Sequence, residues 1–117
     1  MTSYDGLKAA LGSYRIVRKF EEKLLLGSLR LTEGGRLDFR RYKSAQDISP
    51  SELSRLPDVL CCIIFPDPNL PPIKCRLKLL LSCLNEALAV SPSFLILDES
   101  RSRVIEFYRG ALTSCEV

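Results

Sequence analysis

The stretch VLCCIIFPDPNLPPIKCRLKLLLSCL, residues 59–84, contains four of the five cysteines and four of the seven prolines of this 117-residue chain. Its first seven residues, 59–65, are continuously apolar and lie between Asp58 and Pro66. This pattern predicts a strand that is buried on both faces. The PDPNLPP segment that follows, residues 66–72, has too few free N–H groups for a regular ladder and predicts a stiff loop. The stretch therefore predicts the core of the fold.

Residues 73–90 allow two interpretations. In IKCRLKL, residues 73–79, apolar and charged residues alternate strictly, which is the periodicity of a strand. Polar residues four positions apart also outline a narrow stripe on an otherwise apolar helix: Lys74, Lys78, Ser82 and Glu86. Two prolines before the segment favour a helix start, and the apolar pattern is long. We therefore favour one long helix that ends near Val90, with a strand over residues 73–79 as the alternative.

Two antiparallel hairpins are predicted on either side of this stretch. Residues 23–31 and 36–43 flank TEGG, whose glycine pair supplies the positive φ of a tight turn. In the second of these strands, Leu37 and Phe39 face the core. Its solvent-facing side carries Arg36, Asp38, Arg40 and Tyr42. The second hairpin is formed by residues 94–98 and 103–109 around a short polar turn.

Start and stop signals predict two further helices. One covers residues 4–14, with Ser3 as its N-cap and Gly12 near its end. The other lies in ISPSELSRL, where Ser49 and Glu52 form a capping box and a proline takes the first helical position. The predicted fold is α+β, a single domain over residues 1–117. Its mainly antiparallel sheet consists of two hairpins plus a central strand, with two to three helices packed on one side. The ends, residues 1–3 and 111–117, are predicted to be frayed.

Composition and charge set limits on the class of protein. The chain is 46% hydrophobic and 26% charged, as in an ordinary globular protein. Its net charge is +3, but residues 1–47 hold ten Lys and Arg against six Asp and Glu. This surplus of four is compatible with an anionic partner. The longest apolar run has seven residues, against about 20 for a membrane-spanning helix, and no signal peptide is visible. These two features predict an intracellular protein, cytoplasmic or nuclear, and in such a reducing compartment the five cysteines are expected to be free thiols.

The sequence gives little indication of catalysis or of metal binding. The chain has no histidine, which removes the commonest general base and the commonest metal ligand. Cys75 lies between two cations that would lower the pKa of a catalytic thiol, but a core role for this residue outweighs that interpretation. The spacing of Cys61, Cys62, Cys75 and Cys83 does not match a zinc site. We therefore predict no enzyme, no metal, no cofactor and no small-molecule substrate.

Basic residues are the more informative feature. One cluster falls in the first predicted hairpin and a second follows the proline loop. The candidate partner-binding residues are Arg36, Arg40, Arg41, Tyr42 and Lys43 in the first cluster, and Lys74, Arg76 and Lys78 in the second. Such a strand can hold phosphates and stack a base, or lie against anionic lipid at about 1 kcal/mol per cation. Alternatively, the charges only protect a sheet edge from aggregation.

The sequence thus predicts a non-catalytic small interaction or assembly protein, of a matrix-like or accessory type. It would dock an anionic or protein partner through its basic hairpin. It would also self-associate into a homo-oligomer, through a sheet edge or an apolar helix face. An RNA- or DNA-binding module is the alternative, an anionic membrane surface is a further possible partner, and a cysteine-dependent enzyme is a remote alternative.

Overall fold

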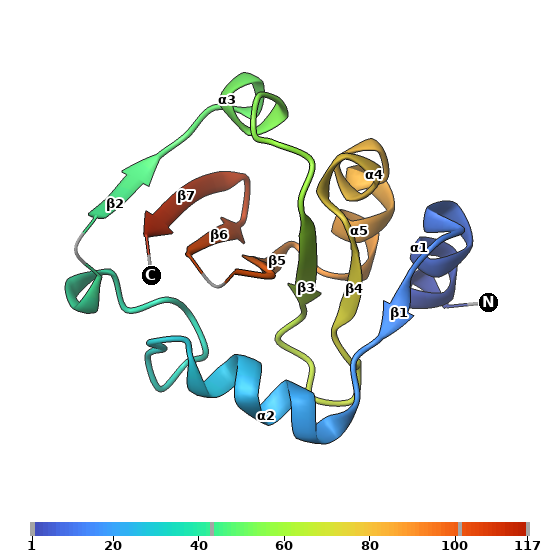
Figure 1. Ribbon diagram of the computed structural model, residues 1–117, viewed down its shortest axis with the longest axis horizontal. Helices are drawn as coiled ribbons and strands as arrows, with labels where there is room; N and C mark the ends of the chain where they lie inside the picture. The colour runs from blue at the N-terminus through green and yellow to red at the C-terminus, as the bar shows by residue number, and fades with distance from the viewer. Residues whose placement is uncertain (1, 43, 101, 117) are drawn as a thin grey trace.

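The computed structural model describes residues 2–42, 44–100 and 102–116. The strands in these residues are β1 (Arg15–Ile16), β2 (Ser44–Asp47), β3 (Leu60–Ile64), β4 (Ile73–Arg76), β5 (Ser93–Asp98), β6 (Arg103–Tyr108) and β7 (Ala111–Glu116). The helices are α1 (Ser3–Leu11), α2 (Lys19–Gly27), α3 (Pro50–Ser54), α4 (Leu77–Ser82) and α5 (Leu84–Val90), with a short 3-10 helix η1 (Phe39–Arg41). The strands form one antiparallel sheet in the order β1-β4-β3-β5-β6-β7-β2 (Figure 1). The predicted α+β class is confirmed.

Strand β3 lies inside the sheet, between β4 and β5. Cys61 and Ile63 belong to one apolar core, here called the first core. Cys62 and Ile64 belong to a second core on the opposite face. Because side chains alternate across a strand, a strand between two cores is apolar at every position. The prediction of a doubly buried strand is confirmed.

Helices cover both faces of the sheet. Residues of α1, α3, α4 and α5 pack in the first core. The second core is covered by α2, through Leu25 and Leu26, and by the segment 28–42 that follows it. Figure 1 shows α2 along the lower edge of the molecule, apart from α1, α4 and α5. The sequence predicted helices on one side, and the structure adds α2 on the other.

Several local predictions are confirmed. Helix α3 begins at the predicted capping box of Ser49 and Glu52. Helix α1 ends at Gly12, whose φ of +71° is the left-handed conformation that glycine tolerates. Its capping box, however, is made by Thr2 rather than by Ser3, which is already the first helical residue. Strands β5 and β6 form the predicted second hairpin.

The first predicted hairpin is wrong. Residues 23–31 begin inside α2, and the pairing between the two segments is one isolated bridge, between Leu31 and Leu37. The glycine turn itself persists, with Gly35 at a φ of +82°. The sequence KFEEKLLLG consists mostly of good helix formers and places two glutamates in the first turn, where they interact favourably with the helix dipole. Helix propensity therefore outweighs the strand pattern here.

Residues 36–42 also differ from the predicted strand. The Asp38 side chain accepts a hydrogen bond from the backbone N–H of Arg40 and caps η1. Tyr42 at the end of η1 is extended again, and β2 begins at Ser44. A local side-chain cap therefore replaces the expected ladder hydrogen bonds.

The preferred long helix over residues 73–90 is also wrong, and the strand alternative holds for its first part. Ile73 and Cys75 alternate into the first core from β4, which pairs with β3 and β1. The helical pattern is followed only from Leu77 onward, and it breaks at Cys83 between α4 and α5. Pairing on both sides gives the strand hydrogen bonds that an isolated segment lacks, so the alternation decides residues 73–76.

The prediction of a frayed C-terminal end is wrong for residues 111–116. These residues form β7, which pairs with β6 on one side and with β2 on the other. Cys115 is completely buried in the second core. The segment is ordered because it supplies the ladder partner of β2, a contact between residues far apart in the sequence. At the other end, Thr2 caps α1, and residues 1 and 117 lie outside the described part of the chain.

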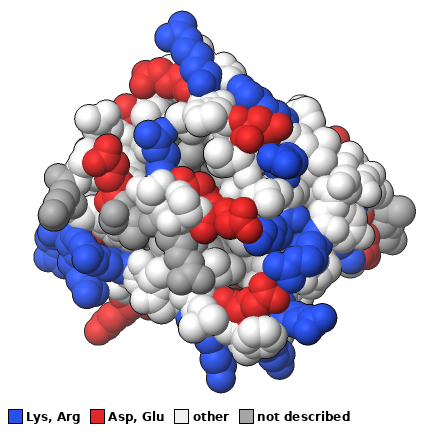
Figure 2. Space-filling model, viewed as in Figure 1, with Lys and Arg blue, Asp and Glu red and all other residues white. Residues whose placement is uncertain are grey.

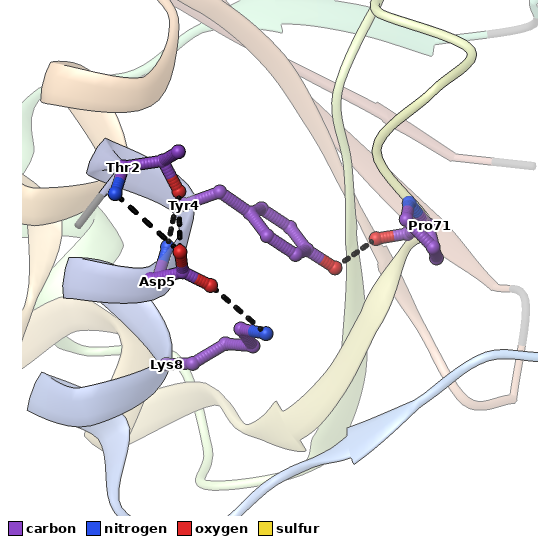
Figure 3. Close-up of polar contacts among 5 residues, drawn as sticks. All are labelled: Thr2, Tyr4, Asp5, Lys8 and Pro71. Carbon is purple, nitrogen blue, oxygen red and sulfur yellow. Dashed lines mark hydrogen bonds and ion pairs between the residues drawn. The ribbon is translucent and has the colours of Figure 1, made fainter.

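Helix α1 is tied to the proline loop by Tyr4. The Tyr4 hydroxyl donates a hydrogen bond of 2.7 Å to the backbone carbonyl of Pro71, and the Lys8 ammonium, which pairs with Asp5 at 3.3 Å, lies 5.0 Å from the Tyr4 ring centroid (Figure 3). The Tyr4 ring meets Phe65 edge-on, with 6.2 Å between the ring centroids. Burial, followed by the nearby phenol and carboxylate charges, raises the pKa of Tyr4 from 10.0 to about 12.

This raised pKa predicts a pH-dependent contribution of Tyr4 to stability. The protonated phenol is favoured in the folded state, so its contribution is complete below pH 10 and is lost as the pH rises toward 12. At neutral pH, Tyr4→Phe is expected to lower the free energy of unfolding by about 1 kcal/mol, the value of one hydrogen bond. Urea unfolding of both proteins across the alkaline range measures the difference. A difference that stays constant up to pH 12 would contradict this account.

Candidate functional site

Arg36, the first residue of the second strand of the predicted hairpin, is engaged within the protein. Its guanidinium forms an ion pair of 2.8 Å with Glu106 of β6. It also lies 3.6 Å from the ring centroid of Tyr108, in a cation–π contact. The partner carboxylate is only 4% exposed and accepts a second hydrogen bond, from the backbone N–H of Leu37. Arg36 therefore fastens the segment 28–42 to the sheet.

The other members of the first cluster are dispersed. Tyr42 is buried in the second core and its hydroxyl accepts a hydrogen bond from the Arg30 backbone N–H. The prediction that Tyr42 lies on a solvent-facing strand is thus wrong. Arg40 is exposed and pairs with Asp38 at 3.2 Å, which lowers the pKa of that carboxyl. Arg41 is exposed, and Lys43 lies outside the described residues.

The second cluster does not form a single patch either. Lys74 points to the side of β4 opposite the first core and pairs with Glu99 at 2.6 Å. Arg76 is exposed at the end of the same strand. Lys78 lies in the first turn of α4, and its ammonium group donates a hydrogen bond to the Ser54 carbonyl. Its backbone N–H donates to the Asp58 carboxylate. Because the strand ends at residue 76, Lys78 leaves the face of β4 that Lys74 and Arg76 share, and the three cations do not lie together.

Helix α2 presents a surface that the prediction missed. Phe20 and Leu24, one helical turn apart, are 61% and 59% exposed. Arg18, Lys19 and Lys23 beside them are also exposed. We call these five residues the α2 surface. In Figure 2, Lys and Arg side chains project from the lower edge of the molecule, where Figure 1 shows α2.

The cations of the α2 surface are available for a partner. Within the described residues, none of the three has an ion pair. The negative charge of the neighbouring Glu21 is compensated by Arg15, which donates two hydrogen bonds to its carboxylate, at 3.0 and 2.9 Å. These bonds lower the pKa of Glu21. Glu22, the other acid of the helix, is half-buried beside a cavity near the Arg36 pair.

A helical interpretation of the sequence would have revealed this surface. Phe20 and Leu24 are four residues apart, as are Lys19 and Lys23, so each pair lies on one side of a helix. In a strand the same residues alternate between faces, and no patch results. The α2 surface was missed because residues from 23 onward were assigned to a strand.

The cysteines lie where apolar side chains belong. All five are free and buried. Hydrogen bonding between Cys61 and Cys75 raises the pKa of Cys61, to which burial adds, and lowers the pKa of Cys75. Cys75 is nevertheless only 3% exposed, so its sulfur is not accessible to a substrate. Burial likewise raises the pKa of Cys62 and Cys115. These surroundings suit core packing rather than nucleophilic chemistry.

A cavity of about 330 Å³ next to Cys61 also brings polar groups together. Asp98 lines it, but its carboxylate already accepts hydrogen bonds from the hydroxyls of Ser100 and Ser102 and from the Ser102 backbone N–H. A carboxylate held in its own turn in this way is a poor general base. In the part of the chain that the structure describes, no group of three or more acidic or cysteine side chains could hold a metal ion.

Comparison with known protein families and with curated proteins finds no match to this chain. Across residues 2–42, 44–100 and 102–116, no helix is both long and apolar enough to cross a bilayer. The α2 surface is therefore characterised by its geometry and charge alone.

Proposed function

We propose that this protein is a non-catalytic docking protein that binds an anionic partner through the α2 surface. The exposure of Phe20 and Leu24 beside three cations carries the proposal. Single exposed apolar residues are common on soluble proteins. Two on one helix face, beside cations and next to an acid, Glu21, that is already paired with Arg15, combine an apolar contact with charge complementarity.

The proposed docking function is the one that the sequence predicted, but its site is the α2 surface instead of the predicted hairpin. The predicted hairpin residue Arg36 has an internal partner, whereas Arg18, Lys19 and Lys23 keep their charges at the surface. An accessory or matrix-like role in an intracellular compartment, cytoplasmic or nuclear, fits this docking surface and the five free cysteines. Self-association stays a prediction.

Nucleic-acid binding stays the alternative function. Burial of Tyr42 weakens it, because the aromatic ring expected to stack on a base lies in the second core. Phe20 is exposed and offers a ring face. The cysteine-dependent enzyme is not proposed further, since burial of Cys75 argues against it.

Charge reversal on α2 tests the proposal. The variant Lys19→Glu/Lys23→Glu is expected to bind immobilised heparin, a generic polyanion, at least about tenfold more weakly than the wild type, since each cation contributes about 1 kcal/mol near an anionic surface. Both side chains are exposed, so the thermal unfolding midpoint should change little. Elution salt and direct titration measure the binding.

The control is Arg40→Glu/Arg41→Glu, which alters the net charge by the same amount at η1. It is expected to keep most of the heparin affinity. Equal losses in the two variants would mean that net charge alone governs binding, and would overturn the proposal. A larger loss in the η1 variant would move the site to that cluster instead.

A further inference from the structure

We propose that the partner of the α2 surface is an anionic lipid bilayer. Phe20 and Leu24 insert at the boundary between headgroups and acyl chains, while Arg18, Lys19 and Lys23 lie among the headgroups. This inference rests on the proposed docking function and names its partner. It concerns reversible binding to the membrane surface and no spanning segment.

The shape of the surface favours a bilayer. Helix α2 lies along the outer edge of the molecule, and Figure 1 shows no other element outside it. Its inward residues Leu25 and Leu26 are held by the second core, so the helix is anchored before it meets a partner. Phe20 and Leu24 are both mostly exposed on this edge helix, and Leu24 also borders a cavity of about 290 Å³. Exposed apolar side chains on a pre-formed helix suit a flat, deformable surface.

The side-chain chemistry agrees with this shape. Phe and Leu are typical of the apolar face of an interfacial helix, with Lys and Arg on its flanks. The aliphatic parts of the Lys19 and Lys23 side chains can lie along the inserted apolar residues, while their ammonium groups contact the lipid phosphates. Free buried thiols indicate a reducing compartment, and the membrane leaflets that face the cytoplasm carry the anionic lipids.

Other partners fit less well. Two side chains expose an apolar area on the order of 200 Å², against about 800 Å² per partner in a standard interface, which is too little to hold a second copy. A symmetric pairing of two α2 helices would also bring like charges together. For a nucleic acid, Leu24 has no π-face to stack on a base. A bilayer uses all five residues of the surface.

A tryptophan probe tests insertion directly. The chain contains no tryptophan, so Phe20→Trp introduces the only indole and preserves the apolar character of the site. With vesicles of equimolar phosphatidylserine and phosphatidylcholine, its emission is expected to shift to the blue and to be quenched by brominated acyl chains. With vesicles of phosphatidylcholine alone, no shift is expected. The control Leu88→Trp, on the exposed part of α5, should show no shift with either vesicle.

Sedimentation with the same vesicles measures affinity. Phe20→Ser/Leu24→Ser is expected to reduce binding by about tenfold or more, because the inserted apolar area is lost while every charge remains. Added salt should also weaken wild-type binding. Binding without a blue shift at position 20, or serine variants that bind as well as the wild type, would overturn the lipid assignment.

The vesicle and heparin experiments separate the two proposals. If Lys19→Glu/Lys23→Glu weakens heparin binding but the wild type ignores anionic vesicles, the docking surface stands and lipid is the wrong partner. A single-stranded RNA or an acidic protein would then be the partner class. If the charge-reversed variant behaves like the wild type with heparin and with vesicles, the docking function fails, and the lipid assignment fails with it.

Discussion

A chain that stops after Gly110 is expected to lose its cooperative fold. The deletion removes β7, which pairs with β6 from Arg103 to Tyr108 and with β2 from Ser44 to Asp47. It also empties the completely buried position of Cys115 in the second core. Strand β2 has no other ladder partner in the described sheet. The loss should be comparable to the total stability of a small domain, roughly 5–15 kcal/mol.

Circular dichroism melting and binding of a hydrophobic dye measure this loss. The matched control stops after Cys115, which removes Glu116, exposed at the end of β7, and residue 117. This shorter deletion keeps the buried cysteine and should melt cooperatively, close to the wild-type temperature. If the residues after Gly110 were a frayed tail, both truncated chains would melt alike. Cooperative unfolding of the longer deletion at the wild-type temperature would contradict the assignment of β7.

The second large effect is expected at the buried ion pair. Arg36→Ala leaves the Glu106 carboxylate, which is only 4% exposed, with a single hydrogen bond from Leu37. Removing one partner of a buried pair typically costs about 3–5 kcal/mol. The Arg36 side chain is 42% exposed, so the pair is partly hydrated and the expected loss is about 2–4 kcal/mol.

A double-mutant cycle isolates the interaction. The variant Arg36→Ala/Glu106→Ala should lose less than the sum of its two single variants, because neither charge is then left unpaired. Arg36→Lys keeps the charge but not the planar group that lies over Tyr108, and should lie between wild type and Arg36→Ala. Urea unfolding gives the free energies of all five proteins: the wild type, the two alanine variants, the double variant and Arg36→Lys. Additive losses would contradict the pairing.

An exposed cation serves as the comparison for this cycle. Arg40→Ala removes a residue whose side chain is 89% exposed, and should leave the free energy of unfolding almost unchanged. If Arg36→Ala were equally harmless, Arg36 would be free for a partner, as the sequence first indicated. The cycle therefore also tests whether the predicted basic hairpin or the α2 surface is the available cationic site.

The predictions that succeeded depended on near neighbours in the chain. Ser49 and Glu52 cap α3 from three residues apart, and Gly12 ends α1 by its own conformation. The unbroken apolar run around Cys61 and Cys62 indicated a strand with a core on each face. In each case the free energy that selects the structure comes from a few adjacent residues, so their order in the chain is sufficient.

The predictions that failed depended on distant partners. The run Leu24–Leu25–Leu26 is compatible with a helix or a strand. The helix is favoured because it packs against the second apolar face of the sheet and buries it. The pattern of residues 73–76 is compatible with a strand or with the start of a longer helix, and pairing with β1 and β3 makes them a strand. The docking site was predicted in the wrong place for the same reason, because the α2 surface forms only when residues 19–27 are helical.

Composition, local caps and apolar patterning were thus enough for the α+β class, the central strand and the core role of the cysteines. They could not show that Arg36 pairs with Glu106, seventy positions away, or that β7 lies between β6 and β2. Nor could they show which cations stay free at the surface. Those outcomes depend on burial against residues remote in sequence, and a charge is available to a partner only when folding brings it no internal counter-ion.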